Sequence, residues 1–430
     1  MPLITLCCKL FGVTKQCKTC SQPFEIAPKD EKFYKQLEVP KPTFCPACRE
    51  QRRLVWRNER TLYSRPCDRT KKPIISYIAP DSPIPVYGLE EWFKDDWDSR
   101  NYGQEIDFNR PFFEQFRELL EKTPHIPLLI GDSENCEYTN FGWCNKNSYM
   151  ISAADFNEDC FYSGYLFKSR DCSDCFFADN CELCYECVDC EKCYDTNYSQ
   201  RCKNCNNSWY CEDCIGCNEC IGCINLRNQR YHILNQKLEK EEYLKQKTKI
   251  LANPDLLTQK LLELRKKEPT KATYNTKCEN SVGNNLHNCK NCFQCFDLIE
   301  SEDCRYVTYG TGAKDCMDLN GAPEVELQYE CVASPSSYHC RFCSSCWVKS
   351  SYLTYCHLCR ASQNCFGCIS LYQNKFCILN KQYEKNEYYE LHDRLIEHMK
   401  ETGEWGEFFP TEVSPFKYED TVAMDYYPKK

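Results

Sequence analysis

The sequence predicts a mixed, mainly β protein. A small metal-binding head is expected to precede two repeated, cysteine-laddered parallel β-solenoid lobes with helical caps. Three observations lead to this fold class. The chain holds 39 cysteines in 430 residues. Two C-x2-C pairs lie near the N-terminus, and most of the other cysteines recur in steps of three.

The composition excludes several classes of protein. The chain is too long for a short secreted disulfide scaffold, and with 42% hydrophobic residues it is too apolar for a disordered chain. No run approaches 18 apolar residues, and the N-terminus lacks a signal-peptide pattern. We therefore predict a cytoplasmic protein with no membrane partner, no evident small-molecule substrate and reduced cysteines.

Charge and repeats divide the chain into parts. Residues 1–72 hold 16 Lys+Arg against 7 Asp+Glu, whereas the remainder holds 38 against 56. This asymmetry indicates a basic head on an acidic body. The predicted parts are a metal domain with a basic helix (1–72), an α+β connector (73–135), a first cysteine-repeat lobe with helices (136–270), a second lobe with a helix (271–402) and an aromatic C-terminal tail (403–430).

Four cysteines of the head have the spacing of a metal site, C-x2-C-x24-C-x2-C. They are Cys17, Cys20, Cys45 and Cys48. Each pair can direct two thiolates of one tight turn at the same ion, and two such turns complete a closed tetrahedral site. We predict one structural Zn²⁺ here, which supplies about 10–16 kcal/mol of folding free energy.

The residues around this site carry a family resemblance. Phe24, Phe33-Tyr34, Pro42 and Cys45-Pro-Ala-Cys-Arg49 resemble the probable zinc-ribbon domain of bacteria over about residues 15–60. The resemblance implies a treble-clef fold, in which the last two ligands open a helix. The whole chain also resembles cysteine-rich hypothetical proteins of environmental bacteria, loosely labelled zinc-ribbon or CaiB/BaiF family, although no feature of a CoA-transferase is present.

The helix predicted from residue 48 to residue 60 is basic. Its candidate contact residues are Arg49, Arg52, Arg53, Arg57, Arg60 and Trp56. Guanidinium groups beside an aromatic ring suit phosphates and bases, so a nucleic-acid or protein partner is one interpretation. The alternative is a solvated helix face, or arginines docked against the acidic body, with Asp95, Asp96 and Asp98 as candidate partners.

The connector is expected to contain two short strands and two helices. The strands are Ile74–Tyr77 and Pro85–Tyr87, and the first helix spans Leu89–Trp97. Asn109 is the expected N-cap of the second helix, which stops at Pro124. His125 has no ligand pattern around it and is expected to be structural.

The cysteine-rich region contains two superimposed repeats. A shift of 30 residues carries all seven cysteines from Cys172 to Cys193 onto those from Cys202 to Cys223. A shift of 145 residues carries Cys220–Leu226 onto Cys365–Leu371, with similar residues at equivalent positions. The chain therefore holds two homologous lobes.

A step of three puts successive cysteines on opposite faces of a flat strand, so the chain must turn a corner between them. Repeated corners, with a recurrence near nine to twelve, predict a narrow solenoid with small inward side chains. We expect four aromatic residues to fill wider layers: Phe176, Phe177, Tyr185 and Tyr194. Helices begun by Asn235, Asn253 and Asn380 should cap the open ends.

Three interpretations of the lobe cysteines remain open. They are buried reduced thiols, ligands of additional zinc or another soft metal, or ligands of iron–sulfur clusters. The candidates for extra metal are Cys181, Cys184, Cys187, Cys190, Cys211, Cys214, Cys217 and Cys220. The first four imitate C-x2-C-x2-C, but the ending of an iron–sulfur motif is missing.

No catalytic motif is present, and no catalytic residue is predicted. The sequence favours a non-enzymatic zinc-binding repeat protein that acts as a binding or scaffold module. The alternatives are a nucleic-acid or ribosome-associated factor that uses the basic helix, and an iron–sulfur or multi-metal redox or storage protein.

Overall fold

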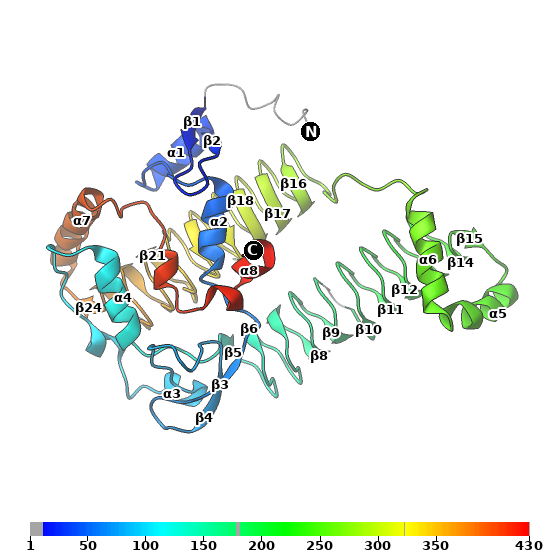
Figure 1. Ribbon diagram of the computed structural model, residues 1–430, viewed down its shortest axis with the longest axis horizontal. Helices are drawn as coiled ribbons and strands as arrows, with labels where there is room; N and C mark the ends of the chain where they lie inside the picture. Colours follow the sequence, from blue (N-terminus) through cyan, green and yellow to red (C-terminus); the bar gives the residue numbers. More distant parts are fainter. Residues whose placement is uncertain (1–11, 178–180, 322, 430) are drawn as a thin grey trace. The chain divides into compact units, whose positions relative to one another are not determined.

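The computed structural model describes residues 12–177, 181–321 and 323–429 (Figure 1). It confirms a mainly β protein with β-solenoid coils between residues 130 and 378, in two stretches separated by the helices Lys240–Leu251 and Pro254–Arg265. The described chain divides into two compact units. Leu128–Ala272, here called the inserted unit, contains the first predicted lobe. The residues on either side of it form the second, the main unit.

Most solenoid coils have twelve residues and four corners, and the second lobe also contains a repeat of eleven residues (Thr276 beside His287) and one of thirteen (Tyr338 beside Ser351). Cys172 pairs in parallel with Cys160 on one side and with Cys184 on the other. Every third residue has a positive φ, as at Asp159 (53°) and Tyr162 (51°), and turns the chain through a corner. The residue after each corner points inward. Many corner residues are Asp or Asn, which tolerate this left-handed backbone better than most.

The coil geometry explains why many of the inward residues are small and able to form hydrogen bonds. Each side offers three backbone N–H groups, and two donate to carbonyls of adjacent coils, as Glu158 does to Ser169 (3.0 Å). The third belongs to the inward residue and donates to the inward side chain one coil earlier, as Cys160 does to Ser148 Oγ (3.2 Å). That hydroxyl donates in turn to the Lys146 carbonyl (2.9 Å).

Cysteine fills the same double role. The N–H of Asn380 donates to Cys368 Sγ (3.4 Å), which lies 3.4 Å from the carbonyl oxygens of Phe366 and Cys377. An inward cysteine or serine is small, accepts one hydrogen bond and donates another, and so avoids the cost of an unpaired buried N–H or C=O. Apolar residues such as Leu298 and Val307 fill other inward positions.

The strands of the inserted unit run in parallel from one coil to the next, with one antiparallel strand at the end. They are β5 (Ile130–Gly131), β6 (Asn140–Trp143), β7 (Ser152–Asp155), β8 (Glu158–Phe161), β9 (Arg170–Ser173), β10 (Cys184–Tyr185), β11 (Tyr194–Asn197), β12 (Asn206–Trp209), β13 (Asn218–Ile221), β14 (Arg230–Ile233) and β15 (Gln236–Lys237). Two helices follow, α5 (Lys240–Leu251) and α6 (Pro254–Arg265).

The main unit holds the head, the connector as far as Pro127, the second lobe from Thr273 onward, and the tail. Its strands are β1 (Val13–Gln16), β2 (Pro23–Ile26), β3 (Tyr63–Pro66), β4 (Pro73–Ser76), β16 (Val282–His287), β17 (Phe293–Ile299), β18 (Arg305–Thr311), β19 (Met317–Asn320), β20 (Tyr329–Val332), β21 (Ser351–Thr354), β22 (Gln363–Phe366), β23 (Lys375–Ile378) and β24 (Lys381–Gln382). Its helices are α1 (Pro28–Gln36), α2 (Pro46–Leu54), α3 (Leu89–Trp92), α4 (Phe112–Lys122), α7 (Lys385–Glu401) and α8 (Val422–Tyr426), with short 3₁₀ turns η2 (Ser99–Tyr102), η3 (Thr411–Val413) and η4 (Tyr418–Asp420).

The two sequence repeats have different structural meanings. The 30-residue shift spans two and a half coils, so it reproduces the three-residue step and not the coil. The 145-residue shift relates the last coils of the first lobe to the last coils of the second. In both lobes the last parallel strand turns back into an antiparallel one, β14–β15 and β23–β24, before a helix begins.

The predicted role of two asparagines needs correction. Asn235 and Asn380 do not cap helices, because Glu239 and Glu384 are the N-caps of α5 and α7. Instead, the Asn380 side chain accepts from the Ile369 N–H (2.8 Å) and donates to the same residue's carbonyl (2.9 Å). Asn235 forms the same pair of bonds in the inserted unit. Each side chain therefore satisfies a backbone N–H and a backbone carbonyl at the last coil of its lobe. Asn253 does cap α6, as predicted.

The predicted aromatic layers are wrong. Tyr185 and Tyr194 are exposed, and Phe176 and Phe177 lie partly exposed on the outside of the coil. The interior of the coil is filled by cysteines and aliphatic side chains, and an aromatic ring is too large for it.

The connector and tail cover the second lobe. β4 lies one residue from its predicted position, and the helix predicted at Leu89–Trp97 ends at Trp92. Pro111, not Asn109, is the N-cap of α4. The tail packs back on the same unit, as expected from its aromatic content: Phe409 stacks on Phe116 with ring centroids 4.7 Å apart.

Candidate metal centre

Two local structures position the four head cysteines. Cys17 and Cys20 lie in the turn between β1 and β2, where the Cys17 N–H donates to the Gln22 carbonyl (3.0 Å). Cys45 is the N-cap of α2 and Cys48 lies in its first turn. Pro46 suits this start because the first helical position has no N–H partner inside the helix.

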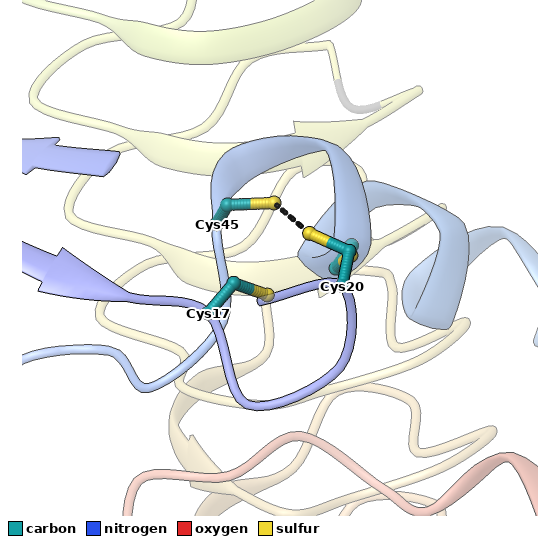
Figure 2. A group of neighbouring side chains, drawn as sticks. Cys17, Cys20 and Cys45 are labelled. Atoms are coloured by element: carbon teal, nitrogen blue, oxygen red, sulfur yellow. Dashed lines mark hydrogen bonds between the residues drawn. The ribbon is translucent and has the colours of Figure 1, made fainter. Parts of the chain in front are cut away.

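The four sulfur atoms form a compact cluster. All lie within 4.8 Å of one another. Figure 2 shows the side chains of Cys17, Cys20 and Cys45 converging, and the sulfurs of Cys20 and Cys45 are 3.8 Å apart. A tetrahedron with metal–sulfur bonds of about 2.3 Å has edges of about 3.8 Å. The cluster can therefore hold a metal ion.

The protein environment already favours one thiolate of the cluster. Burial raises the pKa of the Cys17 thiol, but backbone N–H groups of Cys20, Cys45 and Thr19 lower it, and the result is a pKa of about 6. Burial and the neighbouring thiols instead raise the pKa of Cys48. A bound cation would favour the charged form of all four sulfurs.

Three of the predicted contact arginines are buried on the second lobe. α2 lies against β19 and β20 (Figure 1). Arg49 Nε donates to Asp318 Oδ2 (2.9 Å), and Arg53 Nη1 lies 3.4 Å from the other oxygen of this carboxylate. Arg52 donates to Glu330 (3.0 Å). All five side chains are at most 8% exposed.

The remaining candidates lie beyond α2, which ends six residues before the predicted helix end. Arg57 is buried and donates to the Asn320 carbonyl (3.1 Å). Trp56 is fully buried against Phe409, with ring centroids 4.5 Å apart. Arg60 is half exposed. The arrangement matches docking against acidic groups, which the sequence offered as the alternative to a nucleic-acid contact.

The predicted carboxylate partners of these arginines are wrong. Asp96 pairs with Arg69 (2.6 Å) and Asp98 with Arg100 (2.6 Å), all within the connector. The partners that sequence reasoning missed are Asp318, Glu330 and also Glu407, which accepts from Arg52 (2.8 Å). No spacing in the sequence links residues so far apart.

The ladder cysteines have a different environment. No group of three or more of them, among the residues the structure describes, brings all its sulfurs within 4.8 Å of one another. Burial raises the pKa of Cys295 and of Cys331 and so favours their protonated form, whereas hydrogen bonds with the thiols of Cys172 and Cys181 lower the pKa of Cys175 and of Cys184. A protonated thiol can donate to a carbonyl, whereas a metal-bound thiolate cannot.

Comparisons with known proteins add no assignment. The chain matches no protein-family model and no curated protein. The similarity to zinc-ribbon proteins therefore rests on the residues quoted above. Within the described ranges, no helix has both the length and the apolar character needed to cross a membrane.

Proposed function

We propose that the protein is a non-enzymatic binding or scaffold module whose head is a treble clef closed by one structural Zn²⁺. The proposal rests on the four converging sulfurs of Cys17, Cys20, Cys45 and Cys48. Four protein thiolates leave no open position on the ion, which is typical of a structural site and unlike a catalytic one. The hairpin turn and the helix start that supply the two pairs are the parts of a treble clef.

Cobalt substitution tests this site. The full chain refolded with Co²⁺ should bind one equivalent and show the d–d bands of a tetrahedral ion together with thiolate-to-cobalt charge transfer. Cys45→Ser should abolish these bands. Octahedral Co²⁺, or unchanged spectra in Cys45→Ser, would show that the cluster is not a four-thiolate site.

The outer surface of the inserted unit supports a binding role. One edge of its coils exposes large apolar side chains to between 38% and 56%. This aromatic edge comprises Tyr138, Met150, Phe161, Tyr162, Tyr185 and Tyr198. Several of its rings also contact one another from coil to coil, as Tyr185 and Tyr198 do (5.5 Å). Rows of exposed apolar side chains on the outside of a solenoid are typical of interaction surfaces.

A matched pair of variants tests the aromatic edge. Phe161→Ser with Tyr162→Ser removes part of it, whereas Phe156→Ser with Phe167→Ser removes exposed rings from a different edge of the same coils. Cross-linking of the full chain in its native cells should recover a partner with the wild type and the second variant, and several-fold less with the first. Equal recovery from all three would contradict the proposed edge.

The alternatives gain less from the structure. Of the six residues proposed for nucleic-acid contact, five are buried, so this function would depend on Arg60 and on residues outside the predicted set. Salt-sensitive RNA retention lost in Arg60→Ser would favour it. Stoichiometric iron in purified protein would favour the redox alternative. We place the protein in the cytoplasm, where its many free thiols stay reduced.

A further inference from the structure

The hairpin β3–β4 repeats the metal-binding hairpin β1–β2. Val13 pairs with Ile26 in the first hairpin, and Tyr63 pairs with Ser76, fifty residues further on, in the second. Each has four paired residues on either strand and a turn of the same length. In both, a buried cysteine begins the turn and a proline begins the second strand, and these are the only two identities.

The two turns also share their backbone hydrogen bonds. The Cys67 N–H donates to the Lys72 carbonyl (2.8 Å), as the Cys17 N–H does to Gln22 (3.0 Å). The Cys67 carbonyl accepts from the Lys71 N–H (2.8 Å), and the Cys17 carbonyl accepts from Ser21 (3.0 Å). These two donors have the same unusual backbone conformation, with φ of 63° and 58°.

The match continues into the helix that follows each hairpin. Gly88, the N-cap of α3, has φ −59° and ψ 157°, and Cys45, the N-cap of α2, has φ −66° and ψ 161°. The turn after Cys67 is tied to the chain before this cap by Asp68 N–H to the Val86 carbonyl (2.8 Å). In the head, Lys18 N–H bonds in the same way to the Thr43 carbonyl (3.1 Å).

The correspondence assigns a counterpart to every ligand of the first site. The residues at the positions of Cys17, Cys20, Cys45 and Cys48 are Cys67, Thr70, Gly88 and Glu91. One sulfur thus remains. The Cys67 sulfur accepts from the N–H groups of Gly88 (3.2 Å) and Thr70 (3.5 Å). The Cys17 sulfur takes backbone hydrogen bonds from Cys45 and Cys20, which occupy the corresponding positions in the head.

An ion pair completes the replacement of the ligands. Arg69 Nε, in the turn, lies 3.3 Å from Glu91 Oε2, in α3. In the head, the four clustered cysteines make the equivalent connection between the β1–β2 turn and α2. Hydrogen bonds to Cys67 and this ion pair hold the second hairpin to its helix without an ion.

We infer that residues 63–92 are a second copy of the head's metal-binding unit. Three of its four ligand positions no longer hold cysteine, so its four-thiolate site for Zn²⁺ is latent. The inference rests on the proposed metal role of the first cluster. It goes beyond that proposal because it makes the head and the start of the connector a tandem of one metal-dependent and one metal-independent unit.

Restoring the ligands tests the inference. Gly88 has a negative φ that any residue adopts, and a Cβ built there lies 4.0 Å from Cys67 Sγ, with Ile74 Cγ2 at 3.3 Å. The full-length variant Thr70→Cys, Gly88→Cys, Glu91→Cys should bind one more Zn²⁺ per chain than the wild type. Adding Cys67→Ser should remove that extra ion.

The outcomes separate the two proposals. A wild type without metal contradicts the proposed function, whatever the variant does. A folded triple variant with no more metal than the wild type overturns the second copy. If the triple variant does not fold, Thr70→Cys with Gly88→Cys keeps the Arg69–Glu91 ion pair and offers three thiolates. It should bind Cd²⁺ with sulfur-to-cadmium charge transfer, and a folded double variant without this signal overturns the inference.

Discussion

The head and the lobes use the same side chain for opposite purposes. In the head, Cys17, Cys20, Cys45 and Cys48 converge on one point, where four thiolates can replace a hydrophobic core. In the lobes most cysteines follow a corner and point into the coil, where a thiol such as that of Cys368 accepts one N–H and faces two carbonyls. Holding a cation in the head needs charge on sulfur, whereas a ladder thiol that donates to a carbonyl needs its proton.

The difference shows why a cysteine count is a poor guide to metal content. Serine takes the ladder position without change of role: Ser199 Oγ donates to the Asn197 carbonyl (2.9 Å) and accepts from the Cys211 N–H (3.0 Å). Such exchange is impossible at a thiolate ligand of zinc. Four predictions sharpen this contrast, from the largest expected effect to the smallest.

Loss of a head ligand should have the largest effect. Cys45→Ser should release the ion and unfold the segment from β1 to α2, since a structural site of this kind supplies about 10 kcal/mol or more of folding free energy. Limited proteolysis and metal analysis measure both effects. Cys67→Ser is the matched control and should stay protected. Equal protection and equal metal in the two variants would contradict a ligand role for Cys45.

Breaking the buried contact between head and lobe should come next. Asp318→Asn leaves Arg49 and Arg53 without their shared carboxylate, and removing one partner of a buried ion pair costs about 3–5 kcal/mol. Asp96→Asn breaks an exposed pair with Arg69 and should cost about 1 kcal/mol or less. Urea unfolding compares them. Similar midpoints for both variants would show that the α2 arginines are not docked.

A partly buried charge should weaken the inserted unit. Burial raises the pKa of Asp155 to about 6 in the folded chain, against an ordinary value of 3.8, although the Trp143 N–H bonded to it (2.8 Å) acts the other way. The protonated form is thus favoured by folding, and stability falls as pH rises between these two values.

Asp155→Asn should therefore stabilise the protein at pH 7–8, by about 3 kcal/mol at most, and change nothing below about pH 4. Thermal melting of both proteins across this range gives the comparison. A constant difference at every pH would mean that ionisation of Asp155 is not the cause.

Single ladder positions should show the smallest effects and the clearest pattern. Cys368→Ala leaves the Asn380 N–H without its acceptor inside the coil and should cost about 1–3 kcal/mol. Cys368→Ser keeps both hydrogen-bonding roles and should stay within about 1 kcal/mol of the wild type. If serine destabilises as much as alanine, the ladder depends on sulfur itself, for example through a metal.

The sequence allowed the solenoid and the metal cluster to be predicted for physical reasons. A three-residue step excludes a flat strand, and two C-x2-C pairs are a local pattern. The coil length was less accessible, because any multiple of three preserves the pattern: Cys172 matches Cys202 across two and a half coils. The partners of the basic helix were not predictable, since Asp318 reaches Arg49 only through folding.

The relation between the two hairpins was also not predictable from the sequence, although they lie only fifty residues apart. Cys67 and Pro73 are all that the second hairpin shares with the first, and no spacing of cysteines marks it. The resemblance is carried by backbone bonds and by the φ of Lys71, which sequence comparison does not detect.

Metal content and thiol content, measured on one anaerobic sample of the full chain, test the division of the cysteines most directly. The account predicts one zinc per chain. It also predicts 35 titratable thiols in denaturant that leaves the ion bound, and all 39 once a chelator is added. Several metal ions per chain, or stoichiometric iron with correspondingly fewer thiols, would contradict it.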